Sequence, residues 1–387
     1  MIELPAGPLD KPFIARHVRP LFSRVLAGDR SIYLANHSLG RPPDRMLEDV
    51  TDAIEVWYRR LGDAWEEWLA AREKFRALTA QLVGAPRADC IVPKTSAGQG
   101  LRAVLNAYDK PLRVVTTDAE FDSIDFILRV YRQRGRIELA IVPPCTEAIL
   151  AALSQKTDLV VLSSVLFRTG EIVAELDALI REAHTGGTMV LLDVYHHAGV
   201  LPLNLAALEA DFAIGGSYKY TRGGPGACWL YVRPDHVETM RTLDTGWFAK
   251  EAPFHYERPD PPRFASGGDA WLESTPAVLA PVQALAGLEF TLAIGVERLR
   301  VYHLAQKHRF AALLAAEGLT VKGAGPDFGA FVTIAHEHAT LLAEELTRRG
   351  VKTDVRGDRL RLCPDLLNTD EELSRAAHIV GATMRRL

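Results

Sequence analysis

The sequence has little cysteine and no excess of positive charge. Its four cysteines stand far apart, at positions 90, 145, 228 and 363, and none forms a CxxC pair. This spacing excludes a disulfide framework and a zinc knuckle, and it suits a reducing cytoplasm. The 45 Lys and Arg residues are outnumbered by 49 Asp and Glu residues, which gives a net charge of −4. We therefore expect no nucleic-acid partner.

The chain also lacks an apolar leader and a run suited to a membrane. Its first twenty residues include Glu3 and Asp10 and contain no apolar core of a signal peptide. The most membrane-like stretch, 276–296, contains Gln283 and Glu289, and a carboxylate in mid-membrane is expensive. We interpret this stretch as a buried helix of a soluble cytoplasmic protein that has no membrane partner.

What is present is an ordinary globular composition, with 48% hydrophobic and 24% charged residues in 387. Helical periodicity over 43–83 predicts two amphipathic helices. Seven short apolar runs then alternate with helical patterns, at 90–92, 113–116, 138–142, 159–162, 188–192, 212–214 and 227–232. Because most of these runs lack polar alternation, they predict an α/β fold with a mainly parallel seven-stranded sheet covered by helices.

The remainder of the chain predicts a smaller domain. Residues 233–275 are rich in Pro, Gly and aromatics, and a long loop of this kind is usually functional. A helical region follows at 277–316. The end of the chain predicts strands at 320–322, 331–334 and 359–362 and helices at 339–349 and 371–384. We expect an N-terminal segment at 1–45, a large domain at 46–280 and a small C-terminal α+β domain at 281–387.

The most informative segment is 211–232, DFAIGGSYKYTRGGPGACWLYV. Lys219 stands between Tyr218 and Tyr220, after a buried strand and before a glycine-rich turn. Burial would lower the pKa of this amine and make it a nucleophile suited to Schiff-base chemistry. The alternative is a solvated loop lysine.

A carboxylate is expected at the same sheet edge. Asp193 ends the strand in MVLLDVYHHAGV, and ligands bind at the carboxyl ends of such strands. A protonated pyridine nitrogen is the cationic partner that a buried Asp meets in pyridoxal-phosphate enzymes. His196 could share the site with Asp193, whereas His197 reads as a core or rim residue. A βαβ unit would bring Asp193 and Lys219 to the same edge.

A third segment, 90–107, allows two interpretations, an anion site and a dinucleotide-binding site. Thr95 and Ser96 precede a helix, where hydroxyls and free amides can bind phosphate or simply cap the helix. The rival is a dinucleotide fingerprint, GxGxxA over 98–103 with Asp118 about 20 residues on. Two observations count against the dinucleotide hypothesis. Four residues separate the strand from the first glycine, where the tight turn would need almost none, and the hypothesis leaves Asp193 and Lys219 unexplained. A possible metal pair, His336 and His338, has no evident third ligand and reads as a solvated turn.

These motifs together resemble the kynureninases, within the fold-type I, aspartate aminotransferase-like enzymes of class V. GSYKYTRGGPG is similar to their cofactor-lysine segment and is the most specific of the matches. The other matching pieces, which follow in the expected order, are YLANHSLG (33–40), FRTGE (167–171), DVYH (193–196), GWF (246–248), STP (274–276) and RLRLCP (359–364). The resemblance covers nearly the whole chain.

The resemblance implies a pyridoxal-phosphate cofactor and a homodimer with a shared active site. Lys219 would carry the cofactor and move protons at the substrate Cα, with Tyr218 as an acid/base helper. Asp193 would pair with the pyridine nitrogen, supported by His196. Thr95, Ser96, Tyr218 and Trp247 would hold the phosphate, together with Thr275 of the neighbouring subunit. Phe121 would stack on the ring, Ser163 would lie near the cofactor, and Arg361 would bind the substrate carboxylate, with Arg359 as the fallback.

The departures from the family pattern lie near the expected substrate pocket. His37 replaces the usual Asn, Lys250 replaces a His, and the usual F-P-T-D becomes FDSID at 121–125. We expect an amino-acid hydrolase of kynureninase type that releases alanine and an aryl acid. The alternatives are transamination or β-elimination on another amino acid, a desulfurase using a cysteine, a nicotinamide oxidoreductase built on 98–118, and a non-catalytic binding module.

Overall fold

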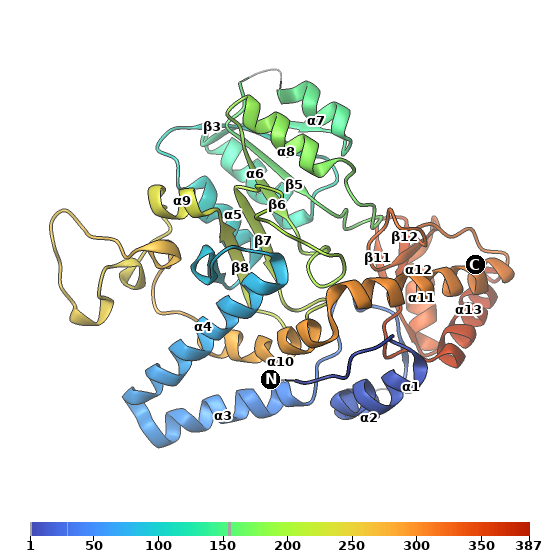
Figure 1. Ribbon diagram of the computed structural model, residues 1–387. Coiled ribbons are helices and arrows are strands. Elements are labelled where there is room, and N and C mark those ends of the chain that lie inside the picture. The colour runs from blue at the N-terminus through green and yellow to red at the C-terminus, as the bar shows by residue number, and fades with distance from the viewer. Residues whose placement is uncertain (1, 29, 154–155) are drawn as a thin grey trace.

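The computed structural model describes residues 2–28, 30–153 and 156–387. A seven-stranded sheet forms its centre (Figure 1), in the order β2-β8-β7-β6-β5-β3-β4. The strands are β2 (Ile91–Lys94), β3 (Leu112–Thr117), β4 (Ile137–Val142), β5 (Leu159–Ser163), β6 (Met189–Asp193), β7 (Phe212–Gly216) and β8 (Cys228–Val232). All neighbouring strands pair in parallel except the two pairs that β8 makes, with β2 and with β7. All seven predicted strands are present, and the mainly parallel sheet is confirmed.

Helices cover both faces of this sheet. One face carries α4 (Ala64–Val83), α7 (Thr146–Leu153), α8 (Leu176–Thr185) and α10 (Leu279–Ile294); the other carries α5 (Ala97–Leu105), α6 (Asp122–Gln133) and α9 (Pro234–Thr239). α3 (Arg45–Arg60) packs beside α4 and α10. The strands are therefore buried on both sides, which explains their apolar character in the sequence.

The C-terminal part forms a second, smaller core. It contains α11 (Val296–Ala316), β9 (Val332–Ala335), α12 (Ala339–Arg348), β10 (Val351–Lys352), β11 (Asp354–Arg356), β12 (Arg359–Leu362) and α13 (Asp370–Met384). β9, β12 and β11 make an antiparallel sheet. The strand expected at 320–322 is reduced to a bridge between Lys322 and Thr333. The sequence did not indicate β10 and β11, which are only two and three residues long.

The N-terminal segment is more regular than its sequence suggests. Helical turns occupy 11–28, including α1 (Lys11–Phe13) and α2 (Ser23–Gly28), and β1 (Ile32–Tyr33) pairs in parallel with β10. This segment therefore packs with the C-terminal core. The proposed division at residues 45 and 280 stays a prediction.

Among the described residues, no single helix is long and apolar enough to cross a membrane; α10 and α11 satisfy such a test only as a pair bent by 80°.

Candidate active site

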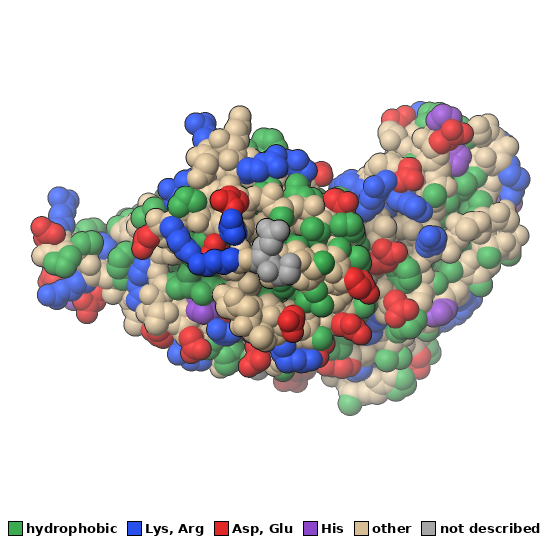
Figure 2. All heavy atoms as spheres, turned by 90° about the horizontal axis from the view of Figure 1, so that it is seen from above, with side chains coloured by type: hydrophobic (Ala, Val, Ile, Leu, Met, Phe, Trp, Pro, Cys, Tyr) green, Lys and Arg blue, Asp and Glu red, His purple; other side chains and the backbone are tan. Residues whose placement is uncertain are grey.

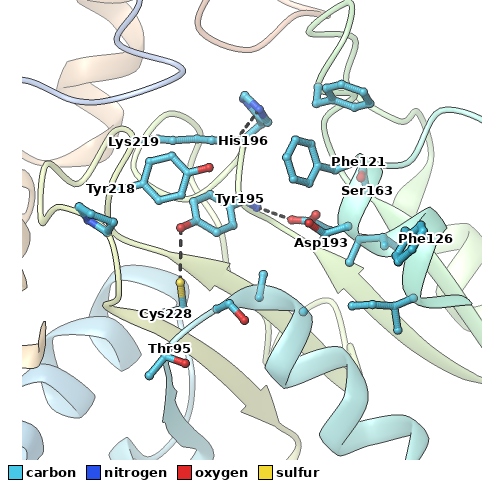
Figure 3. A pocket seen from close by; sticks show the side chains of 18 of the residues that line it. Thr95, Phe121, Phe126, Ser163, Asp193, Tyr195, His196, Tyr218, Lys219 and Cys228 are labelled. Carbon is cyan, nitrogen blue, oxygen red and sulfur yellow. Dashed lines mark hydrogen bonds between the residues drawn. The ribbon is translucent and has the colours of Figure 1, made fainter. Parts of the chain in front are cut away.

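A cavity of about 390 Å³ opens at the carboxyl ends of the parallel strands. Its lining includes eight of the residues predicted from the sequence: Thr95, Ser96, Phe121, Ser163, Asp193, His196, Tyr218 and Lys219. All of these except Ser96 are labelled in Figure 3. These residues come from segments spread over more than 120 positions. The fold thus brings together the lysine, the carboxylate and the helix N-terminus.

Lys219 lies in the turn after β7 and is only 6% exposed. Its Nζ is 2.8 Å from Nε2 of His196. Burial lowers the pKa of this amine to about 7, although the carboxylate of Asp193 opposes the shift. A large part of the amine is therefore unprotonated at neutral pH, as a nucleophile requires. The alternative of a solvated loop lysine is wrong.

The N-terminal segment fixes the turn that carries Lys219. The backbone N–H of Gly40 donates to the carbonyl of Tyr218 at 2.8 Å. A Cβ on Gly40 would lie 1.9 Å from the carbonyl oxygen of Lys219. Only glycine permits this close approach, so the SLG motif and the lysine motif are parts of one substructure.

Asp193 ends β6, and its side chain is buried beside the cavity. One carboxylate oxygen accepts the backbone N–H of Tyr195 at 2.9 Å. Burial raises the pKa of this carboxyl. Within the described ranges, no Lys, Arg or His forms an ion pair with it. A cationic ligand group in the cavity would stabilise its charged form.

His196 links Lys219 to a second tyrosine. Its Nδ1 lies 2.9 Å from the hydroxyl of Tyr220, and its Nε2 faces Lys219. Burial, with a contribution from the charge of Lys219, holds the pKa of His196 well below its usual value. The imidazole is therefore neutral at physiological pH and orients the amine without adding charge.

Thr95 and Ser96 stand at the N-terminus of α5. The Oγ of Ser96 accepts the backbone N–H of Gln99 at 3.1 Å, which makes it the helix cap. Its own hydroxyl proton can still be donated to an anion. Thr95 donates its N–H and its hydroxyl to the side-chain oxygen of Gln99. Capping and anion binding are thus compatible here, and the helix dipole favours an anion.

Phe121 and Ser163 border the opposite side of the cavity. The ring of Phe121 meets that of Phe167 edge-on at 5.4 Å. The hydroxyl of Ser163 donates to Glu120 at 2.6 Å. Burial raises the pKa of Glu120 to about 7.

Arg361 and His37 lie near the cavity but not among its lining residues. Arg361 is buried on β12, donates to the carbonyl of Phe167 and pairs with Asp354. His37 packs on Phe331 at 4.9 Å, its Nε2 lies 3.5 Å from Oδ2 of Asp354, and its Nδ1 has no hydrogen-bond partner among the described residues. Arg359, the fallback, instead lines a separate groove of about 570 Å³.

Trp247 and Thr275 lie outside the cavity that contains Lys219. The indole N–H of Trp247 donates to the hydroxyl of Thr275 at 3.1 Å. Thr275 lines an adjoining cavity of about 160 Å³, which Thr95 also lines. Lys250 lies on the same loop as Trp247 and donates to the carbonyl of Glu257.

Three residues that line or border the cavity were missed from the sequence. Tyr195 could have been found, because it stands two positions after Asp193. Glu120 directly precedes Phe121. Cys228 gave no signal, since the antiparallel pairing of β8 with β2 brings it opposite Lys94, the residue before Thr95.

The dinucleotide alternative is wrong. Gly98 and Gly100 lie inside α5 and not in a strand-to-helix turn. A Cβ on them would come within 2.9 Å of Ile127 and 2.8 Å of Ile214, so these glycines serve helix packing. Asp118 lines the separate groove. His336 and His338 belong to no cluster of three or more metal-binding side chains in the described part of the chain.

The mainly parallel sheet, with Lys219 and Asp193 in one cavity at the carboxyl ends of its strands, is the arrangement of the fold-type I class of pyridoxal-phosphate enzymes. The sequence pattern described as aminotransferase class-V matches residues 36–359, and the chain belongs to this family. This membership confirms the predicted fold class and the predicted cofactor.

Among the curated relatives that this chain resembles are kynureninases. The chain is 29% identical to a kynureninase of Geobacillus thermodenitrificans (strain NG80-2) over 95% of its own length and 90% of the relative's. It is 28% identical to a kynureninase of Deinococcus radiodurans, covering 88% and 85% of the two chains. The resemblance to kynureninases is confirmed.

Solved structures show the same fold at lower identity. A C-DES variant with glycine covalently linked to its PLP cofactor superposes with a TM-score of 0.85 at 18% identity, over 94% of this chain and 98% of that one. An apo cysteine desulfurase from Thermococcus onnurineus NA1 gives a TM-score of 0.79 at 19% identity, over 96% and 98%. At such identities the likeness shows the fold alone.

Proposed function

We propose that this protein is a pyridoxal-phosphate-dependent hydrolase that cleaves the Cβ–Cγ bond of L-kynurenine or a related amino acid, giving alanine and an aryl acid. The observation that carries the proposal is the convergence of Lys219, with its lowered pKa, and Asp193 in one cavity. The kynureninase relatives, which extend over most of the chain, supply the reaction type.

The residues of the cavity fit the cofactor. Asp193 would hold a protonated pyridine nitrogen, Phe121 would cover the ring, and Thr95 and Ser96 would bind the phosphate at the start of α5. When bound, pyridoxal phosphate withdraws electrons from bonds at the substrate Cα. Asp193 would keep the ring nitrogen protonated, because the two opposite charges stabilise each other in a buried site.

Lys219 would hold the cofactor and, once released by the substrate amine, move the proton at Cα. His196, whose Nε2 lies 2.8 Å from the Nζ of Lys219, would orient this amine or accept a proton from it. Tyr218 lines the same cavity, and burial raises the pKa of its hydroxyl, so it would act as a proton donor at neutral pH.

Arg361 and His37 would bind the substrate carboxylate. Arg361 is anchored by Asp354 and by the carbonyl of Phe167, which hold its guanidinium near the cavity. His37 is fully buried, with its Nε2 3.5 Å from Asp354, and a substrate carboxylate could accept a hydrogen bond from its Nδ1, which lacks a partner among the described residues.

A second copy of the chain would complete the site. α3 exposes an apolar stripe that includes Trp57 (57% exposed) and Tyr58 (82%). The loop bearing Trp247 projects from the body and exposes Tyr256 (Figures 1 and 2). Large exposed apolar surfaces mark association sites. Thr275 would then reach the cofactor phosphate of the partner subunit.

Two further parts of the proposal concern reaction class and location. An aminotransferase or β-lyase acting on another amino acid would use the same cofactor residues, since neither His37 nor Lys250, where the sequence departs from the family pattern, lines the cavity that contains Lys219 and Asp193. A desulfurase is disfavoured, because Cys363 is buried and its pKa is raised to about 12.

All four cysteines are free, which supports a cytoplasmic location.

The test is a product assay with L-kynurenine. The purified protein, loaded with pyridoxal phosphate, should form anthranilate and alanine in equal amounts, and Lys219→Ala should form neither. Pyruvate, or an amine passed to an added keto acid, would move the reaction to β-elimination or transamination. Loss of substrate without dependence on Lys219 would overturn the proposal.

A further inference from the structure

Tyr195 is the most prominent cavity residue to which no role has been given. Its ring lies beneath the reactive amine, with the Nζ of Lys219 4.7 Å from the ring centroid. The same Nζ lies 5.6 Å from the centroid of Phe121. The ring of Tyr218 lies at the same distance as that of Phe121, so three aromatic rings of the cavity surround the amine and Tyr195 is the nearest of them.

The position of Tyr195 follows from Asp193. Its backbone N–H donates to the carboxylate of Asp193, so the two residues move as one unit. In Figure 3 the ring of Phe121 lies above this carboxylate and the ring of Tyr195 to its left, with a gap between the two rings. A planar ring whose nitrogen pairs with Asp193 would thus have an aromatic residue on each side.

A glycine at position 216 leaves the space that the side chain of Tyr195 occupies. A Cβ on Gly216 would lie 2.1 Å from the hydroxyl oxygen of Tyr195, so no larger residue fits there without displacing it. The hydroxyl lies 3.5 Å from the Sγ of Cys228, which lies across β2 and β8 from Lys94, the residue before Thr95. The ring of Tyr195 therefore extends from the carboxylate toward the anion-binding end of the cavity.

We propose that Tyr195 is a cofactor-binding residue that forms the second aromatic wall of the slot for the pyridine ring, opposite Phe121. This proposal rests on the proposed function, because it needs the cofactor to be held by Lys219 and Asp193. The wall acts through the ring and not through the hydroxyl. Burial raises the pKa of Tyr195, so the hydroxyl stays neutral and adds no charge to the slot.

The experiment measures cofactor affinity by spectral titration of the cofactor-free protein with pyridoxal phosphate. Tyr195→Leu keeps an apolar side chain but removes the aromatic face, and we expect its Kd to rise about tenfold. Tyr195→Phe keeps the face and should change the Kd by less than about threefold, because a thiol is a weak hydrogen-bond partner. The circular dichroism of the bound cofactor should change in the Leu variant and persist in the Phe variant.

The matched control is Tyr231→Leu. Tyr231 is a buried tyrosine on β8 and is not among the residues lining the Lys219 cavity. Its replacement should lower the melting temperature and leave the cofactor Kd unchanged. Equal affinity and unchanged dichroism in Tyr195→Leu and the unmodified protein would overturn the aromatic wall and leave the proposed function intact. Failure of the unmodified protein to take up the cofactor would overturn both.

Discussion

At the scale of single residues, the chemistry depends on burying one amine beside one carboxylate. Burial disfavours the charged form of Lys219, and Asp193 limits the effect, so the pKa settles at about 7. Neutral His196 and the surrounding rings add little charge of their own. Lys219 is therefore nucleophilic at physiological pH without a dedicated general base.

This balance predicts the pH dependence of cofactor capture. Only the unprotonated amine attacks, so the rate should rise with pH through a midpoint near 7. Asp193→Asn removes the charge that raises the pKa of Lys219, and its midpoint should move to lower pH. Stopped-flow absorbance across the neutral range measures both profiles. A midpoint near 10.5, the value of a free lysine, would contradict the account.

The lowered pKa of Lys219 also affects the stability of the folded chain. The unfolded chain holds the proton of Lys219 up to about pH 10.5, whereas the folded chain releases it near 7. Just above pH 7 the unfolded state thus binds more protons, and this residue makes the free energy of unfolding rise with pH. Lys219→Met should flatten that rise in cofactor-free protein. Denaturant titrations at several pH values test this, and an unchanged slope would count against a buried amine.

Arg361 gives a prediction for the substrate. Arg361→Lys removes the planar fork, and kcat/KM should fall about 10- to 100-fold, chiefly through KM, because a charge-assisted pair contributes roughly 1.5–3 kcal/mol. Arg359→Lys is the control and should change KM less than about twofold, since this half-buried residue lines the separate groove and not the cavity of Lys219. Steady-state kinetics separate the two. A raised KM in the Arg359 variant alone would transfer the role to that residue.

Site residues with a distinctive local pattern could be found from the sequence, and the others could not. Asp193 ends a recognisable apolar strand, and Lys219 follows another by three residues. Cys228 enters the cavity through antiparallel pairing, which local periodicity does not encode. The partners of Arg361 likewise follow from a tertiary contact, since its link to Phe167 joins residues 194 positions apart.

At the scale of elements, the site depends on how the N-terminal segment meets the turn after β7. Gly40→Ala would force the turn of Lys219 to shift, and we expect a loss of about 1–3 kcal/mol together with weaker cofactor binding. Gly62→Ala is the control, because a Cβ there would meet no atom of the described residues within 4 Å. Thermal unfolding and cofactor titration measure both effects. Equal behaviour of the two variants would show that the contact is not needed.

The elements also show what the sequence could reveal. The seven strands of the main sheet are buried on both faces, so each reads as an apolar run. β10 and β11 are too short for any period, and the pairing of β1 with β10 links residues more than 300 positions apart. Short strands and long-range pairings were therefore the parts that sequence patterns could not predict.

At the scale of the whole molecule, the exposed stripe on α3 predicts association. We expect a mass about twice 42.6 kDa by light scattering. Trp57→Glu should shift the protein toward the monomer and reduce activity, because Thr275 would no longer reach the partner's site. Val301→Glu, on an exposed position of α11, should leave the mass unchanged. A monomeric, fully active native protein would refute the shared site.

The measurement that tests the central claim most directly is the visible absorbance spectrum of the protein mixed with pyridoxal phosphate. The account predicts a Schiff-base band that survives removal of free cofactor, shifts when L-kynurenine is added and is absent in Lys219→Ala. A band that persists in Lys219→Ala, or no band in the native protein, would contradict the assignment of Lys219 as the cofactor-bearing residue.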